Sequence, residues 1–188
     1  RGVAHIGTIE ALEHAGFPVD VVSGVSMGAV IGAYYAGGMS LDKLRTIPEE
    51  VTGGIGSMLT TWRLWQLILR DSLASSERME ALVRRGLGDM RFDQMKKPFA
   101  CVAMDLKTGE AIVFREGPLA PAVRASMTLP GIFAPVEYRH RYLVDGGVVD
   151  YIPVDVAKRL GAEWVLASVT EGDFTRERPN SVLSALEQ

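Results

Sequence analysis

The stretch that decides the fold is Val19-Asp20-Val21-Val22-Ser23-Gly24-Val25-Ser26-Met27-Gly28-Ala29-Val30-Ile31-Gly32-Ala33. It places an apolar run, a G-x-S-x-G pattern and a series of small residues in immediate succession, which predicts a strand, a nucleophile elbow and a helix. In such an elbow Ser26 lies at the tip of a sharp turn. Positions 24 and 28 are expected to require glycine, because a Cβ at either position would collide with neighbouring backbone; Gly24 and Gly28 meet this requirement. Ser26 is thereby a candidate nucleophile at a helix N-terminus, where unpaired N–H groups favour an alkoxide or oxyanion.

The G-x-S-x-G pattern has a second interpretation. Five-residue matches arise by chance in a chain with 20 glycines, and a tight strand-to-helix turn can carry a serine that merely caps the helix. The apolar run before the pattern and the small residues after it favour the elbow.

The composition is that of a globular protein with a single domain. Of the 188 residues 47% are hydrophobic and 23% are charged, and the formal net charge is -3, so we expect one domain over residues 1–188. Nucleic acid is excluded as a partner because the basic excess typical of such proteins is lacking. Cys101 is the only cysteine and lies in an apolar run, which excludes an internal disulfide and indicates a thiol buried in the core. No run of 18 apolar residues occurs, and we expect a cytoplasmic protein, with peripheral contact to a membrane left open.

Helical and strand-like patterns alternate along the rest of the chain. The expected helices cover residues 1–15, 27–35, 41–46, 76–85, 119–127 and 153–161, with a loop from Pro48 onward. The expected strands cover residues 99–106, 111–114, 132–138, 142–144 and 163–169, and the last is apolar enough for a parallel strand buried on both faces. This alternation predicts an α/β sandwich of three layers. Because such folds normally open with a strand and a loop, we expect these ahead of the first helix, before residue 1.

One segment combines tryptophan with little polar surface. It runs from Trp62 to Leu69, includes Trp65, and lies beside a glycine-rich loop; it is too short to span a bilayer. A helix of this composition could form a lid or an interfacial patch that contacts lipid. The alternative is a helix buried against the core.

A serine nucleophile needs a base, and the chain order of its histidines is unusual. In α/β-hydrolases the histidine follows the acid, whereas His5, His14 and His140 all precede Asp145 here. Either another chain order brings in a histidine, or the base is a carboxylate. Asp145 is the candidate carboxylate because an Asp-Gly-Gly turn after an apolar strand can direct its side chain into a cleft; a plain turn is the alternative.

Four stretches resemble motifs of the patatin-like phospholipases, most closely those of the short bacterial members. They occur in the family's order and span nearly the whole chain. The end of the family's glycine-rich loop and its first helix resemble Arg1-Gly2-Val3-Ala4-His5-Ile6-Gly7, and the nucleophile motif resembles Gly24-Val25-Ser26-Met27-Gly28. The block before the acid resembles Ala125-Ser126-Met127-Thr128-Leu129-Pro130-Gly131-Ile132-Phe133, and the D-G-[GA] motif resembles Asp145-Gly146-Gly147.

The resemblance implies a patatin-type fold of three α/β/α layers with a mainly parallel central sheet. It also implies a serine esterase that hydrolyses acyl esters of (lyso)phospholipids or related lipids, without a metal or other cofactor. In the implied Ser-Asp dyad Asp145 takes the proton from Ser26, and the reaction passes through an acyl-enzyme. Gly2 and Arg1 would belong to the oxyanion hole, whose other glycines precede the Arg-Gly pair in the family.

The acid would be followed by the turn residues Gly146 and Gly147. The chain departs from the family at Asp150-Tyr151, where many members have an asparagine, and this alters the hydrogen bonding expected near the cleft. Two other functions stay open, a catalytically silent lipid-binding or signalling module and an acyltransferase. The sequence leaves the oligomeric state undetermined.

Overall fold

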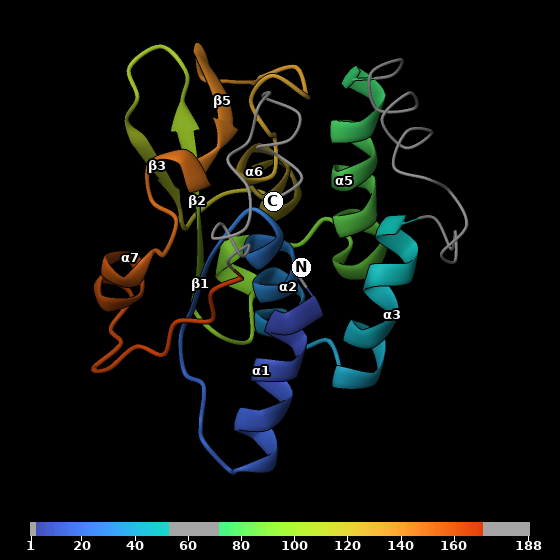
Figure 1. Cartoon of the computed structure of the whole chain (residues 1–188), viewed down its shortest axis with the longest axis vertical. Coiled ribbons are helices and arrows are strands. Elements are labelled where there is room, and N and C mark those ends of the chain that lie inside the picture. Colours follow the sequence, from blue (N-terminus) through green and yellow to red (C-terminus); the bar gives the residue numbers. More distant parts are fainter. Residues whose placement is uncertain (1–2, 53–71, 171–188) are drawn as a thin grey trace, which may run out of the picture.

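The structure is a computed structural model that describes residues 3–52 and 72–170, which form helices packed on a five-stranded sheet (Figure 1). The elements in chain order are α1 (Val3–His14), β1 (Val22–Val25), α2 (Met27–Ala36), α3 (Leu41–Thr52), α5 (Ser72–Leu87), the short 3-10 helix η1 (Phe92–Gln94), β2 (Phe99–Asp105), β3 (Ala111–Phe114), α6 (Leu119–Ser126), β4 (Val136–Tyr138), β5 (Arg141–Asp145), the short 3-10 helix η2 (Gly146–Val148) and α7 (Val154–Arg159). The strand and helix expected on either side of Ser26 are β1 and α2.

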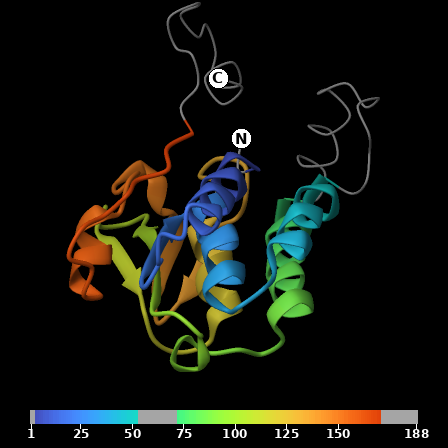
Figure 2. The ribbon, with the colours of Figure 1, turned by 90° about the horizontal axis from the view of Figure 1, so that it is seen from below.

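Strand β2 is the centre of the sheet and is buried on both faces. Phe99, Cys101 and Ala103 belong to the larger core cluster, and Ala100 and Val102 belong to a smaller cluster, because successive side chains of a strand point to opposite faces. Helix α7 covers the face of the smaller cluster, and α1, α2, α3, α5 and α6 lie on the other side (Figure 1, Figure 2). The expected α/β fold with three layers is confirmed.

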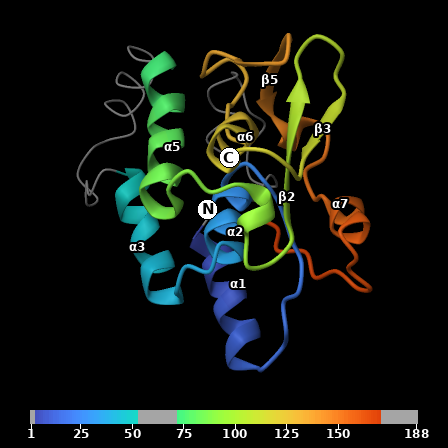
Figure 3. The ribbon, with the colours of Figure 1, turned by 180° about the vertical axis from the view of Figure 1, so that it is seen from behind.

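The sheet is mixed. Strand β1 runs parallel to β2 and pairs with its residues 99–102, whereas β3 pairs antiparallel with residues 101–104 and β5 antiparallel with residues 103–105. Strand β4 extends the sheet beyond β5, also antiparallel, so β1–β2 is the parallel pairing among the described strands. Figure 3 shows β3 and β5 on opposite sides of β2. Some residues of β2 that pair with β3 also pair with β1, and others also pair with β5. Since a strand has only two edges, β3 occupies one edge of β2, and β1 and β5 lie end to end along the other.

Helix α2 approaches the sheet closely because its residues are small. Residues 29–36 are all buried. A Cβ at Gly32 would lie 3.0 Å from Cγ1 of Val22 on β1 and 3.1 Å from Cε2 of Phe99 on β2, so this contact depends on the missing side chain. The close packing fixes where the turn between β1 and α2 lies.

Residues 163–169 do not form the strand expected from their apolar run. The segment is irregular, and its side chains Trp164 and Leu166 are 59% and 55% exposed. None of the described strands pairs with it, and an apolar run becomes a strand only where a neighbour satisfies its backbone hydrogen bonds. The prediction of a buried parallel strand here is wrong.

Several boundaries also differ from expectation. Helix α3 continues through Pro48 to Thr52 instead of ending near residue 46; its buried residues Leu44 and Ile47 pack the helix against the core, which offsets the one backbone donor that proline removes. Helix α5 begins at Ser72, four residues before the expected start. Strand β4 covers Val136–Tyr138 and not the whole of residues 132–138.

Candidate active site

Ser26 lies at the tip of the turn between β1 and α2. Its backbone has φ 53° and ψ -127°, a conformation that residues with a side chain rarely adopt and that costs of order 1–3 kcal/mol. The Ser26 side chain makes no capping hydrogen bond to α2, so this is not a serine that merely caps a helix. The strained turn presents the hydroxyl at the N-terminus of α2, as an elbow does.

The glycines of the two turns differ in how strictly they are required. A Cβ at Gly24 would lie 2.4 Å from the carbonyl oxygen of Gly28, and a Cβ at Gly146 would lie 2.4 Å from the carbonyl oxygen of Val102. Both positions therefore exclude any side chain. At Gly28, by contrast, a Cβ would meet only Nε2 of His5, at 3.8 Å. The expectation that Gly28 avoids a backbone collision is wrong, and that for Gly24 is confirmed.

Asp145 ends β5 and is a buried residue, with 3% of its surface exposed. Its Oδ1 accepts the backbone N–H of Gly147 at 2.8 Å, whereas Oδ2 is buried and has no hydrogen-bond partner within the described residues. Burial raises the pKa of this carboxyl, while the side chain of Ser26 and the N–H of Gly147 act to lower it. Ser26 thus lies close enough to Asp145 to favour the ionised form. A buried carboxylate with a raised pKa beside a serine side chain is well suited to accept a proton.

The end of α6 contacts both turns. Ser126 has no exposed surface; its Oγ accepts the backbone N–H of Ser26 at 3.1 Å and donates to the carbonyl of Val102 at 2.7 Å. Two residues later the carbonyl of Thr128 accepts the backbone N–H of Asp145 at 2.7 Å. The sequence placed both residues in the block before the acid but gave them no role, because a local pattern does not reveal contacts with residues distant in the sequence.

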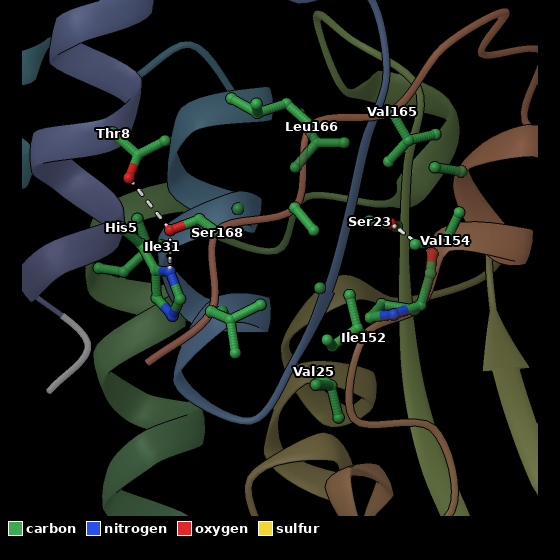
Figure 4. Close-up of a pocket in the computed structure, with 18 of the residues that line it drawn as sticks. His5, Thr8, Ser23, Val25, Ile31, Ile152, Val154, Val165, Leu166 and Ser168 are labelled. Carbon is green, nitrogen blue, oxygen red and sulfur yellow. Dashed lines mark hydrogen bonds between the residues drawn. The ribbon is translucent and has the colours of Figure 1, made fainter. Parts of the chain in front are cut away.

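A cavity of about 880 Å³ reaches Ser26 and Asp145. Every residue of 18–28 and of 161–170 lines it. Since successive residues of an extended chain point to opposite faces, lining by all of them places the cavity along the edge of β1 that β2 does not occupy. Among the residues that line the cavity, Ser168 lies within hydrogen-bond distance of His5 and Thr8 of α1 (Figure 4).

Only one of the three histidines lines this cavity. His5 does so, with Nδ1 2.9 Å from Oγ of Ser168 and a pKa lowered by burial. Nδ1 of His14 lies against a carbonyl of its own helix, and His140 is exposed in the turn between β4 and β5. Neither carboxylate oxygen of Asp145 bonds a histidine among the described residues. The histidine–carboxylate pair that defines a triad is thus not formed in the described part of the chain.

The remaining candidates are placed only in part. Arg1 and Gly2, expected in the oxyanion hole, and the segment from Trp62 to Leu69 lie outside the described residues. Tyr151, at the departure from the family pattern, lines the cavity and donates its hydroxyl to the carbonyl of Thr170.

Two further expectations concern the core and the membrane. Cys101 is fully buried in β2, and burial raises the pKa of its thiol, so it is a core residue as expected. Among the helices that the structure describes, none has the length and apolar character required to traverse a bilayer.

Comparison with known proteins identifies the family of this chain. The family model described as "Patatin-like phospholipase" matches residues 1–158. The chain belongs to the patatin-like phospholipase family. The fold of this patatin-like chain is also similar to the crystal structure of VipD from Legionella pneumophila, with a TM-score of 0.54 and 14% identity over 79% of this chain and 44% of that chain.

Curated relatives of this patatin-like chain are longer than it. An uncharacterised NTE family protein of Mycobacterium bovis is 35% identical over 92% of this chain and 46% of its own length. Lysophospholipase nte1 of Aspergillus fumigatus is 33% identical over 89% of this chain and 11% of its own length. Patatin-like phospholipase domain-containing protein 6 of Homo sapiens is 33% identical over 89% and 12%. The chain thus spans less than half the length of these relatives.

Proposed function

We propose that this domain is a serine esterase that hydrolyses acyl esters of phospholipids or lysophospholipids. Ser26 is the nucleophile, and Asp145 is the general base that activates it without a histidine. Gly2 and Arg1 contribute N–H donors to the oxyanion hole. No metal or other cofactor takes part.

The reaction proceeds in two halves with Asp145 moving the proton each time. Its carboxylate takes the proton of the Ser26 hydroxyl as Oγ bonds to the ester carbonyl carbon, and the tetrahedral oxyanion then collapses. The ester C–O bond breaks, the leaving alcohol takes the proton back from Asp145, and the acyl group stays on Ser26. Water then gives a proton to Asp145 as its oxygen bonds to the acyl carbon; the bond from that carbon to Oγ of Ser26 breaks, Oγ takes the proton back from Asp145, and the fatty acid is released.

One observation carries the assignment: the Asp145 carboxyl lies beside Ser26, whose side chain makes no capping hydrogen bond to α2. Oδ1 is held by the N–H of Gly147 at 2.8 Å, which leaves the buried Oδ2 without a partner within the described residues. Burial raises the pKa of the carboxyl, and the Ser26 side chain opposes that rise. A base works best when its pKa lies near the operating pH, so a raised carboxyl pKa suits this task.

The substrate class is supported by the names of two relatives. One is a lysophospholipase and the other a patatin-like phospholipase domain-containing protein, each 33% identical to this chain. The first name specifies a lysophospholipase and the second a phospholipase-like domain, and the proposal extends phospholipid esters as the substrate class to this domain.

Labelling with a fluorophosphonate probe tests the nucleophile. The intact protein is expected to be labelled at Ser26, and Ser26→Ala is expected to abolish labelling. Ser23→Ala is the matched control, because Ser23 lies three residues earlier, lines the same cavity and donates its hydroxyl to a backbone carbonyl; it should leave labelling intact.

Each rival function corresponds to a distinct result. An unlabelled wild type that still binds phospholipid vesicles would identify a silent binding module and overturn the proposal. A labelled protein that forms a new ester when an acceptor alcohol is supplied, in preference to free fatty acid, would identify an acyltransferase.

A further inference from the structure

We propose that residues 126–128, the last residue of α6 and the two that follow it, form a bridge that sets the position of the nucleophile relative to its base, with Ser126 as a positioning residue. The inference rests on the proposed function. It starts from two hydrogen bonds, from the N–H of Ser26 to Oγ of Ser126 at 3.1 Å and from the N–H of Asp145 to the carbonyl of Thr128 at 2.7 Å.

The N–H of Ser26 needs such a partner because of where β1 ends. Val25 is the last residue of β1 paired with β2, opposite Val102. The next position along that edge, at Ala103, is occupied by Asp145 of β5. The pairing of β1 with β2 thus ends at Val25, and the side chain of Ser126 stands between the Ser26 N–H and the carbonyl of Val102, accepting from the first and donating to the second.

The Ser126 hydroxyl is suited to this task because it both accepts and donates. Its own hydrogen is directed to the carbonyl of Val102 at 2.7 Å, which turns an oxygen lone pair toward the Ser26 N–H. Ser126 has no exposed surface, so water cannot replace either bond without opening the core. The strained backbone of Ser26 is thereby tied to α6 and to β2 at once.

The same bond affects how charge is stabilised in the reaction. In the serine protease template the amide of the nucleophile itself belongs to the oxyanion hole. Here that amide is already bonded to Ser126. The oxyanion must therefore be held by other N–H groups, and the role left for Ser126 is to position the nucleophile.

The second half of the bridge fixes the base. The carbonyl of Thr128 holds the backbone of Asp145, and the Thr128 hydroxyl donates to the carbonyl of Arg124 at 2.9 Å, which ties it back to α6. Both reacting residues are thus anchored to three consecutive residues at the C-terminal end of α6. A displacement of about 1 Å between reacting groups can cost on the order of 10²-fold in rate, so this anchoring has a measurable effect.

The test compares Ser126→Ala with Tyr34→Phe in the intact protein. Both remove a buried hydroxyl that donates to a backbone carbonyl at 2.7 Å, to Val102 in one case and Leu82 in the other. Ser126→Ala is expected to lower kcat for a short soluble ester and the fluorophosphonate labelling rate by about 10–100-fold, with little change in KM and none in the pH midpoint. Tyr34→Phe should lose comparable thermal stability while its labelling rate stays at the wild-type value.

A conservative variant and an amide measurement separate positioning from general damage. Ser126→Cys keeps a side chain of similar size that donates and accepts weakly, so its rate should fall between those of wild type and Ser126→Ala. Hydrogen exchange at the Ser26 amide, followed by NMR, should be faster in Ser126→Ala and unchanged in Tyr34→Phe.

Two outcomes distinguish the failures. A labelled wild type together with a Ser126→Ala rate equal to that of Tyr34→Phe would overturn the bridge and leave the esterase intact. A wild type that no probe labels would overturn the esterase and the catalytic meaning of the bridge together.

Discussion

Ser26 and Asp145 lie where two strands, running in opposite directions along one edge of β2, end against each other. β1 pairs up to Val102 and β5 pairs down to Ala103, so the two turns that follow them open at the same place. The first turn can close onto the start of α2 only because position 24 is glycine, and the second can approach β2 closely only because position 146 is glycine. The site is therefore a consequence of strand pairing, although its two residues are far apart in the sequence.

Relief of the strain at Ser26 should stabilise the fold. Glycine adopts positive φ without cost, whereas alanine keeps the Cβ that makes the observed φ of 53° unfavourable. Setting about 1–3 kcal/mol of strain against the larger unfolded-state entropy of glycine, Ser26→Gly should exceed Ser26→Ala in free energy of unfolding by about 1 kcal/mol. Urea unfolding with equal m-values measures the difference. Coincident midpoints would show that the turn is not strained.

The two glycines of the G-x-S-x-G pattern should respond differently to alanine. Gly24→Ala places a Cβ 2.4 Å from backbone oxygen and should cost about 1–3 kcal/mol, as overpacking does. Gly28→Ala introduces only an ordinary contact at 3.8 Å and improves helix propensity in α2, so it should be neutral or stabilising by up to about 1 kcal/mol. Thermal denaturation of the pair checks this, and equal losses would contradict it.

The Asp145 carboxyl should reduce stability at neutral pH. Burial raises its pKa in the folded state, so its ionisation opposes folding, and the stability present at acidic pH is lost as the pH rises through that pKa. Asp145→Asn removes this cost and should melt at a higher temperature than wild type near pH 7. The difference should vanish at a pH low enough to protonate Asp145.

Asp105→Asn is the control of opposite sign. The backbone N–H of Lys107 lowers the pKa of Asp105, with contributions from Thr108 and Arg141, so its ionised form favours the folded state. This substitution should lower the melting temperature near pH 7, and its effect should fade as the pH falls through the lowered pKa. If both substitutions changed the melting temperature near pH 7 in the same direction, burial would not be what sets the pKa of Asp145.

The elbow, the hairpin of β2 and β3 and the Asp145 turn could be predicted because each depends on neighbours in sequence. An apolar run followed by G-x-S-x-G contains its own turn chemistry, and residues 111–114 of the expected hairpin are β3. Residues 163–169 could not be predicted, since an apolar run does not reveal whether a strand lies beside it to accept its hydrogen bonds.

The long-range hydrogen bonds of Ser126 could not be predicted for a related reason. Its partners Ser26 and Val102 are 100 and 24 residues away, and only the shared edge of β2 brings them together. Gly28 fitted the motif, yet its surroundings in the fold would admit a Cβ. Local patterns thus pointed to the candidate residues Ser26 and Asp145, and the contacts that position them came from tertiary structure.

The last prediction separates a dyad from a triad. In a triad the acid only orients a histidine that carries the proton, whereas in a dyad loss of the carboxylate removes the base itself. Asp145→Asn should therefore cost about as much as Ser26→Ala, on the order of 10³-fold or more in turnover, while His14→Gln and His140→Gln should stay active. His5 is the stringent case because it lines the cavity, and His5→Gln keeps a polar group near Ser168. Since burial raises the pKa of Asp145 and only the ionised carboxylate accepts a proton, turnover should fall as the pH drops through that raised value. A folded His5→Gln protein as inactive as Ser26→Ala would refute the dyad.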